Sequence, residues 1–193
     1  MSFQGAPDRV LTIPTAPDAG AGANFPMNEP VLGYRAWLVE RGRHGCRLRG
    51  VMVPAEWAGA PCTWTAAVCA PPAGSASRMV RHDPACVPHP DCTCGLYAYD
   101  SLSSGGYDER LGQAYGAEVG IVWGAVVGAG RVLAYRDSWR AQFARPVAML
   151  QGSGDDRDVR GVAEQLGVPA VPMSGIHRVA AEFGRSAMVL AAR

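Results

Sequence analysis

The sequence predicts an α+β fold, in which a mainly antiparallel sheet is joined by a few helices and a cysteine-rich, loop-rich region. Three observations lead to this prediction. Apolar, β-rich segments separated by glycine-containing turns recur through much of the chain. Roughly the last forty residues show the apolar spacing of helices instead. A stretch dense in Pro, Gly and Cys lies in the middle of the chain, where few regular elements can form.

The length of 193 residues and the hydrophobic share of 48% fit one domain with its own core. Residues 1–28 are rich in Pro, Ala and Gly and lack apolar periodicity, so we expect a flexible N-terminal arm with a short strand at "RVLTIP". The arm is either a passive tail or a segment that docks on a partner. Residues 29–193 are predicted to form a single α+β domain, with a cysteine-rich loop region over 57–95.

The first strands of this domain are predicted over residues 31–40 and 46–54, joined as a hairpin by the turn "RGRHG". Within the loop region only "CTWTAAVC", which ends at residue 69, resembles a strand. Residues 94–101 are typical of a strand or of the first turn of a helix. Residues 108–116 predict a short helix.

Three further segments, 119–127, 131–137 and 144–152, are apolar and rich in β-formers, and each predicts a strand. The tripeptide "GAG" between the first two predicts a hairpin turn there.

The C-terminal part begins with "DDRDVRGVAEQLG", which has an Asp cap, helical apolar spacing and Gly167 as a stop signal. "VPAVP" predicts a short strand, and "SGIHRVAAEFG" predicts a second helix. A strand–helix–strand order here indicates one parallel crossover.

Composition excludes several classes of function. All 18 basic residues are arginine, so Schiff-base catalysis by a lysine and a phosphate-loop lysine are ruled out. No membrane helix is expected, and the N-terminal sequence does not resemble a signal peptide, so we expect a cytoplasmic protein without membrane contact. Thiols stay reduced in that compartment, so the six cysteines are more typical of ligands, buried groups or reactive thiols than of disulfides.

The segment "RHDPACVPHPDCTCG" concentrates cysteine, histidine and proline, and it predicts a zinc site. The predicted ligands are Cys69, Cys86, Cys92 and Cys94. His82 or His89 is the alternative for one of them. A disulfide across the Cys-x-Cys pair would close a small, strained ring, whereas tetrahedral zinc tolerates so short a chelate. Zinc would also order a loop region that has few large apolar residues.

The spacing of these cysteines is not one of the strong zinc signatures, because Cys-x2-Cys pairs are absent. Buried thiols without a ligand, or a redox or catalytic thiol, are therefore the alternatives. His89 stands between two prolines, which suits an exposed loop histidine as well as a ligand. His82 precedes Asp83 and could be oriented by a nearby carboxylate. Cys46 and Cys62 lie outside the cluster and are predicted to be packing residues.

Four segments together resemble a family of uncharacterised, mainly actinobacterial proteins: "GYRAW" at 33–37, "TWTAAVC" ending at Cys69, "HPDCTCGLYAY" at 89–99 and "SWRAQFARPVAML" at 138–150. The mark of that family is a Cys-x-Cys-Gly-(Ile/Leu)-Tyr-Ala segment preceded by a tryptophan and a cysteine. The resemblance covers roughly residues 31 to 172 and implies no activity. It implies a histidine shortly before the Cys-x-Cys pair, for which Cys86 or His82 is the nearest substitute here.

Two other motifs bear on partners. The arginines at the tip of the first hairpin are Arg41, Arg43, Arg47 and Arg49. They could bind nucleic-acid phosphates, but a solvated turn is the favoured interpretation, since the net charge is only +1. "QGSGDDRD" lacks the third glycine of a dinucleotide loop, and its aspartates would repel phosphate, so it is interpreted as a helix cap.

These observations predict a soluble, zinc-stabilised binding or adaptor module whose protein or small-molecule partner is unknown. The alternatives are a small zinc- or cysteine-dependent enzyme and a thiol redox sensor. A closed site of four protein ligands favours the module, whereas three ligands and a water molecule favour the enzyme.

Overall fold

The computed structural model describes residues 9–13, 30–42, 45–51, 57, 61, 63–69, 82–83, 86–103 and 120–186. The helix predicted over residues 108–116 lies outside these ranges, as do Arg43, Cys62 and most of the predicted N-terminal arm.

The described strands are β1 (Arg9–Ile13), β2 (Val31–Gly42), β3 (Gly45–Gly50), β4 (Thr65–Ala66), β5 (Leu96–Tyr99), β6 (Gly120–Tyr135), β7 (Ser138–Leu150), β8 (Ala170–Val171) and β9 (Arg185–Ser186). The described helices are α2 (Asp156–Leu166) and α3 (Met173–Ala181). The α+β prediction of a mainly antiparallel sheet with helices is confirmed, although strands make up more of the described chain than it implied. None of the helices in the described ranges has the length and apolar character needed to cross a membrane.

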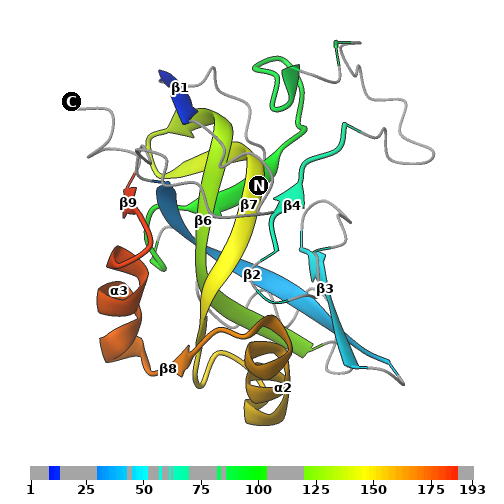
Figure 1. Cartoon of the computed structure of the whole chain (residues 1–193), viewed down its shortest axis with the longest axis vertical. Helices are drawn as coiled ribbons and strands as arrows, with labels where there is room; N and C mark the ends of the chain where they lie inside the picture. Colours follow the sequence, from blue (N-terminus) through cyan, green and yellow to red (C-terminus); the bar gives the residue numbers. More distant parts are fainter. Residues whose placement is uncertain are drawn as a thin grey trace, which may run out of the picture.

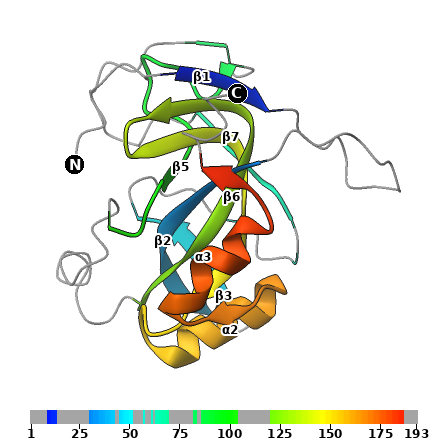
Figure 2. The ribbon, with the colours of Figure 1, turned by 90° about the vertical axis from the view of Figure 1, so that its left-hand side faces the viewer.

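Four strands pair in a closed circuit, in which β6 pairs with β2, β2 with β5, β5 with β7, and β7 with β6. The link between β2 and β5 is short, since only Tyr34 and Tyr99 are register partners. The predicted N-terminal strand is present as β1, which pairs with β6. Figures 1 and 2 show α2 and α3 at one end of this arrangement, with β4 and the coil that precedes β5 rising toward the other.

The first predicted hairpin is confirmed, because β2 and β3 pair antiparallel up to Gly42 and Gly45. The hairpin predicted at "GAG" is wrong, because β6 runs unbroken through it. Gly130, with a φ of 75°, accommodates an extra residue in β6 as a β-bulge between two parts of its ladder with β7. The actual turn comes later, after Tyr135, which pairs with Ser138.

Both predicted C-terminal helices are present, and α3 has Pro172 at its N-cap without a side-chain hydrogen bond. Asp155 caps α2 by accepting a hydrogen bond from the Arg157 N–H, and the helix ends at Gly167 in left-handed conformation. β8 pairs parallel with β7, so β7, α2 and β8 form the predicted crossover.

The core lies on both faces of β2, as its alternating residues require. Trp37 and Val39 belong to a cluster that includes the buried face of α2. Tyr34 and Ala36 belong to another, which includes Ile176 of α3. Each helix therefore covers the sheet at a different hydrophobic cluster.

A candidate metal centre in an interrupted strand

The cysteine-rich region lies in the chain between β4 and β5, two strands that pair with successive stretches of the same edge of β7. β5 follows the edge of β7 from Ser138 to Ala141, and β4 follows the same edge at Phe143 and Ala144. Between them the Ala67 N–H donates to the carbonyl of Gln142 at 2.7 Å. The chain thus leaves the edge after residue 67 and returns to it at residue 96. The candidate site lies in this excursion.

Four side chains from this excursion come together, and each offers one soft donor atom. Cys69 follows β4, Cys92 and Cys94 precede β5, and His82 comes from the segment between them. Their three sulfurs and one imidazole nitrogen all lie within 4.8 Å of one another. The two cysteines of the Cys-x-Cys pair are buried, whereas Cys69 and His82 are half-buried. Four donors this close could hold a metal ion.

Two separations show how well the donors match a tetrahedral ion. Cys69 Sγ lies 3.7 Å from Cys92 Sγ, and Cys94 Sγ lies 3.4 Å from His82 Nε2. A Zn–S bond of about 2.3 Å and a Zn–N bond of about 2.0 Å, at tetrahedral angles, put two sulfurs about 3.8 Å apart and a sulfur and a nitrogen about 3.5 Å apart. The sulfur separation is far too long for a disulfide, and all four described thiols of the excursion are free.

The orientation of His82 suits a ligand. Its Nδ1 lies 2.9 Å from the backbone carbonyl of Asp83, so Nδ1–H donates there and Nε2 presents its lone pair to the cluster. Metal-binding histidines commonly use the second ring nitrogen in this way, which fixes tautomer and ring plane. The ring of His89 stacks on that of His82, with centroids 4.7 Å apart. The hydrogen-bond partner of His82 Nδ1 is a backbone carbonyl and not the carboxylate that the sequence suggested.

The backbone also supports the sulfurs electrostatically. The His89 N–H donates to Cys94 Sγ at 3.3 Å. Burial raises the pKa of the Cys94 thiol to about 12, and it also raises the pKa of Cys69. Burial opposes ionisation of Cys92 as well, but hydrogen bonds to its sulfur, led by the one from the Cys94 N–H, outweigh burial and lower the pKa of Cys92. A bound cation would hold all three sulfurs as thiolates.

The sheet holds the Cys-x-Cys backbone in place. The Arg140 guanidinium of β7 donates to the carbonyls of Cys92 and Cys94, and the Tyr97 hydroxyl of β5 donates to the carbonyl of Thr93. All three consecutive carbonyls are therefore hydrogen-bonded to residues of the sheet. Gly95, with a φ of 119°, then turns the chain into β5.

Three of the four predicted ligands, Cys69, Cys92 and Cys94, belong to this group of donors. Cys86 does not, and His82, the predicted alternative, takes the fourth place. Cys86 is half-buried nearby in the chain, with its N–H bonded to the Asp83 carbonyl. His89 contributes its backbone N–H and its ring face instead of a donor atom. Arg140 and Tyr97 were not singled out from the sequence, because nothing local marks a strand residue that reaches a distant loop.

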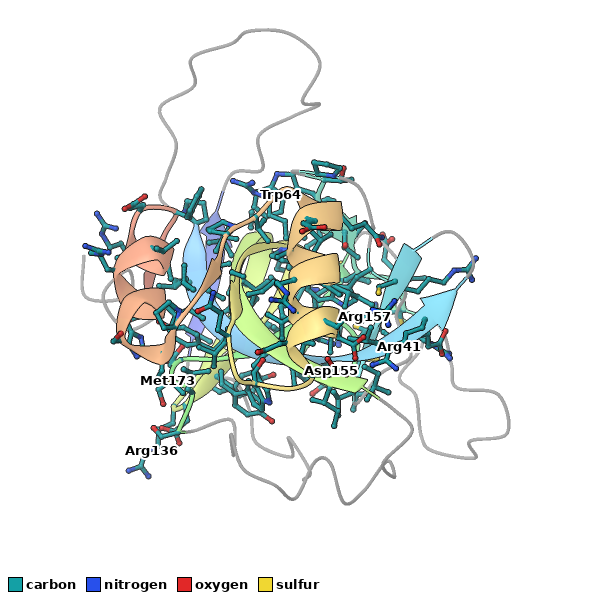
Figure 3. All side chains as sticks on the ribbon, turned by 90° about the horizontal axis from the view of Figure 1, so that it is seen from below. Arg41, Trp64, Arg136, Asp155, Arg157 and Met173 are labelled. Atoms are coloured by element: carbon teal, nitrogen blue, oxygen red, sulfur yellow. The ribbon has the colours of Figure 1, made fainter. Side chains whose placement is uncertain are left out.

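The arginine-rich hairpin tip is partly neutralised. Arg41 pairs with Asp158 at 2.7 Å and with Asp155 at 3.2 Å, where β2 meets the start of α2 (Figure 3). Arg49 pairs with Glu40 at 2.6 Å. These ion pairs reduce the charge available for phosphates, in line with the favoured interpretation of a solvated turn.

Comparisons with protein-family models, with curated proteins and with solved structures gave no match. The family resemblance described from the sequence stays a prediction.

Proposed function

We propose that Cys69, His82, Cys92 and Cys94 bind one zinc ion, and that the chain is a zinc-stabilised binding or adaptor module. The observation that carries this proposal is the convergence of three sulfurs and one imidazole nitrogen within 4.8 Å. Thiolate and imidazole are the ligands that zinc takes in structural sites, and two donor separations match the edges of its tetrahedron.

A structural role is favoured over a catalytic one because the chain itself supplies four donors. Catalytic zinc sites keep three protein ligands and leave the fourth position to water or substrate. Here the backbone carbonyls of the two buried cysteines accept hydrogen bonds from Arg140 of the sheet. These bonds leave the two cysteines little freedom to move during a change of coordination.

The ion would link Cys69, which follows β4, to Cys92 and Cys94, which precede β5. Among the described residues of this region, the hydrophobic cluster has three buried members, Val87, Cys92 and Cys94, with Ala67 and Cys69 packed against it. So little apolar burial contributes only modestly to order, and a metal ion that binds only the folded arrangement adds its binding free energy to stability. We infer that the module is cytoplasmic and that it binds its partner through the metal-bound excursion between β4 and β5.

Thiol redox sensing is the second candidate, and a specific observation favours it. Cys69 Sγ lies 3.7 Å from Cys92 Sγ, and Val68, beside Cys69, is 72% exposed. Hydrogen peroxide could oxidise these two thiolates to a disulfide, with uptake of two protons, reduction of the peroxide to two waters and release of zinc. A Cys69–Cys92 disulfide found by mass spectrometry after peroxide treatment would support this role. Oxidation confined to other thiols would exclude it.

Elemental analysis of the full-length chain tests the proposal. The wild type is expected to carry about one zinc per chain when purified without added metal. Cys92→Ser and His82→Ala should each lose most of it. Cys46→Ser should keep it, because Cys46 is packed beside α2 and outside the donor group.

Cys86→Ser separates the two possible ligand sets, and it should keep its zinc. Zinc retained by His82→Ala but lost by Cys86→Ser would replace the proposed set with four cysteines. A folded wild type that binds no zinc would overturn the proposal.

A further inference from the structure

Arg140 occupies an unusual position for a cation. It lies in β7 opposite Tyr97 of β5, and it is only 2% exposed. Its guanidinium donates through one nitrogen to the carbonyls of Cys92 and Cys94, the latter at 3.1 Å, and through another to the hydroxyl of Tyr135. The rings of Tyr97 and Tyr135 flank it, with centroids 5.6 and 5.2 Å from the guanidinium carbon.

Within the described ranges, Arg140 makes hydrogen bonds to neutral groups and has no carboxylate as a counter-ion. No ion pair joins it to a carboxylate within the described ranges, and its buried Nε has no hydrogen-bond partner there. A buried charge is costly unless an opposite charge lies close by. Two of its hydrogen bonds are to the backbone carbonyls of the buried cysteines of the donor group, Cys92 and Cys94.

The net charge of the proposed metal centre is opposite to that of Arg140. Three thiolates, one neutral imidazole and a divalent ion carry a net charge of −1. One buried guanidinium brings the region to neutrality. The same guanidinium fixes the backbone on both sides of Thr93, so that Cys92 and Cys94 are oriented before the other two donors are engaged.

We propose that Arg140 is the positioning residue of the metal centre: it pre-forms the Cys-x-Cys half of the site and supplies the charge that balances the bound thiolates. This inference rests on the proposed zinc site. It also divides the site into two unequal halves. Cys92 and Cys94 are held by the sheet, whereas no bond from a described sheet side chain holds Cys69 or His82.

Three variants of the full-length chain test the inference. Arg140→Met removes the charge and the bonds while keeping an extended side chain. Arg140→Lys keeps the charge but loses the planar fork that reaches two carbonyls. Arg145→Met is the matched control, because Arg145 is another β7 arginine, half-buried beside the rings of Trp64 and Phe183, and no contact within the described ranges joins it to the donor group.

Zinc affinity is measured by competition with a chelator, and the thiolate-to-metal charge-transfer bands are recorded with Co²⁺ in place of zinc. Arg140→Met should weaken zinc binding by about 10- to 100-fold and alter the Co²⁺ bands, as changes in groups that support metal ligands do. Arg140→Lys should lie between Arg140→Met and the wild type. Arg145→Met should bind as the wild type does.

Thermal unfolding of each variant with and without zinc separates this role from a purely structural one. If Arg140 acts on the site, Arg140→Met loses part of the stabilisation that zinc provides. Equal loss of stability in both states, with unchanged affinity and Co²⁺ spectrum, would overturn the inference. So would Arg140→Lys binding zinc as weakly as Arg140→Met, since charge would then have no part.

If Arg140→Met does not fold, Arg140→Lys decides: affinity equal to that of the wild type would contradict the positioning role. Failure of the proposed zinc site itself would be seen separately, as absence of zinc and of Co²⁺ bands in the wild type.

Discussion

The sheet and the cysteine-rich excursion lie side by side but are ordered by different forces. The sheet has long paired strands and fully buried large side chains such as Trp37, Trp139 and Met149. In the part of the excursion that the structure describes, few apolar side chains are buried, and three sulfurs and one imidazole nitrogen converge instead. One chain can thus combine a sheet that folds by burying apolar surface with a segment whose described contacts are mainly hydrogen bonds and close sulfur and imidazole groups.

The boundary between the two regions is β7 and β5. Arg140 and Tyr97 are sheet residues by backbone pairing, yet their side chains hold the loop. The sheet should therefore survive loss of the metal, whereas the loop should not keep its shape without it.

The largest expected effect comes from breaking the sheet at Trp139. This side chain is fully buried, packs tightly against Gly33 and Gly128, and its Nε1–H donates to the Leu32 carbonyl at 3.0 Å. Trp139→Ala should reduce the free energy of unfolding by about 3–5 kcal/mol in urea titrations. Trp64→Ala, at a half-buried position, should cost clearly less. If the two variants lost the same free energy of unfolding, Trp139 would contribute no more to the core than Trp64 does.

Removing zinc with a chelator should affect only the excursion. We expect the far-UV circular dichroism of the sheet to persist, while limited proteolysis within residues 68–95 becomes at least about tenfold faster as that segment opens locally. Trp139→Ala should instead raise cleavage throughout the chain. Loss of the sheet signal together with the zinc would show that the two regions form one cooperative unit.

A methyl group added at Gly33 tests the close packing of the sheet. An ideal Cβ there would lie 2.5 Å from Trp139 Nε1 and 2.8 Å from the Ala98 Cβ, so Gly33→Ala should destabilise by about 1–3 kcal/mol. Gly161→Ala in α2 is the control, because its Cβ would meet only Cys46 Sγ, at 3.9 Å. That change should stabilise by roughly 0.5–1 kcal/mol through helix propensity. Thermal melts measure both, and destabilisation by the second variant would contradict the packing argument.

The smallest effect concerns Asp100, at the end of β5. Burial, aided by the negative charge of Asp137, raises the pKa of its carboxyl from 3.8 to about 6. Between these values the folded state binds more protons than the unfolded one, so this group makes stability fall as the pH rises from about 4 to about 6. Asp100→Asn should therefore stabilise the protein at pH 7 by about 1 kcal/mol, after allowance for solvent screening, and should lose that benefit at pH 4.

Urea titrations at the two pH values measure this difference, with and without zinc. The same difference in both states is expected, because Asp100 follows the far end of β5 from Cys94 and no contact within the described ranges joins it to the donor group. A benefit from Asp100→Asn that is larger at pH 4 than at pH 7 would reverse the assigned sign.

Local signals were enough to predict much of the fold. Alternation and a polar turn predicted the β2–β3 hairpin, and the caps Asp155 and Gly167 predicted α2. The glycines around Gly130 predict a turn where the structure has a bulge, because a bulge and a turn can need the same backbone conformation. Only the pairing of β6 with β7 on both sides distinguishes the two, and that pairing is not local.

The same limit applies to the site. Clustered cysteines predicted three of the four donors, but the choice between His82 and Cys86 depends on how the loop folds back toward Cys69. Arg140 is separated from Cys92 by more of the chain than any local pattern spans, so its contact with the loop became visible only through the register of β7 with β5.

X-ray absorption at the zinc K-edge of the purified full-length chain identifies the atoms bound to the metal. We expect a first shell of three sulfurs at about 2.3 Å and one imidazole nitrogen at about 2.0 Å. A shell of four sulfurs, or one made mainly of oxygen and nitrogen, would contradict it.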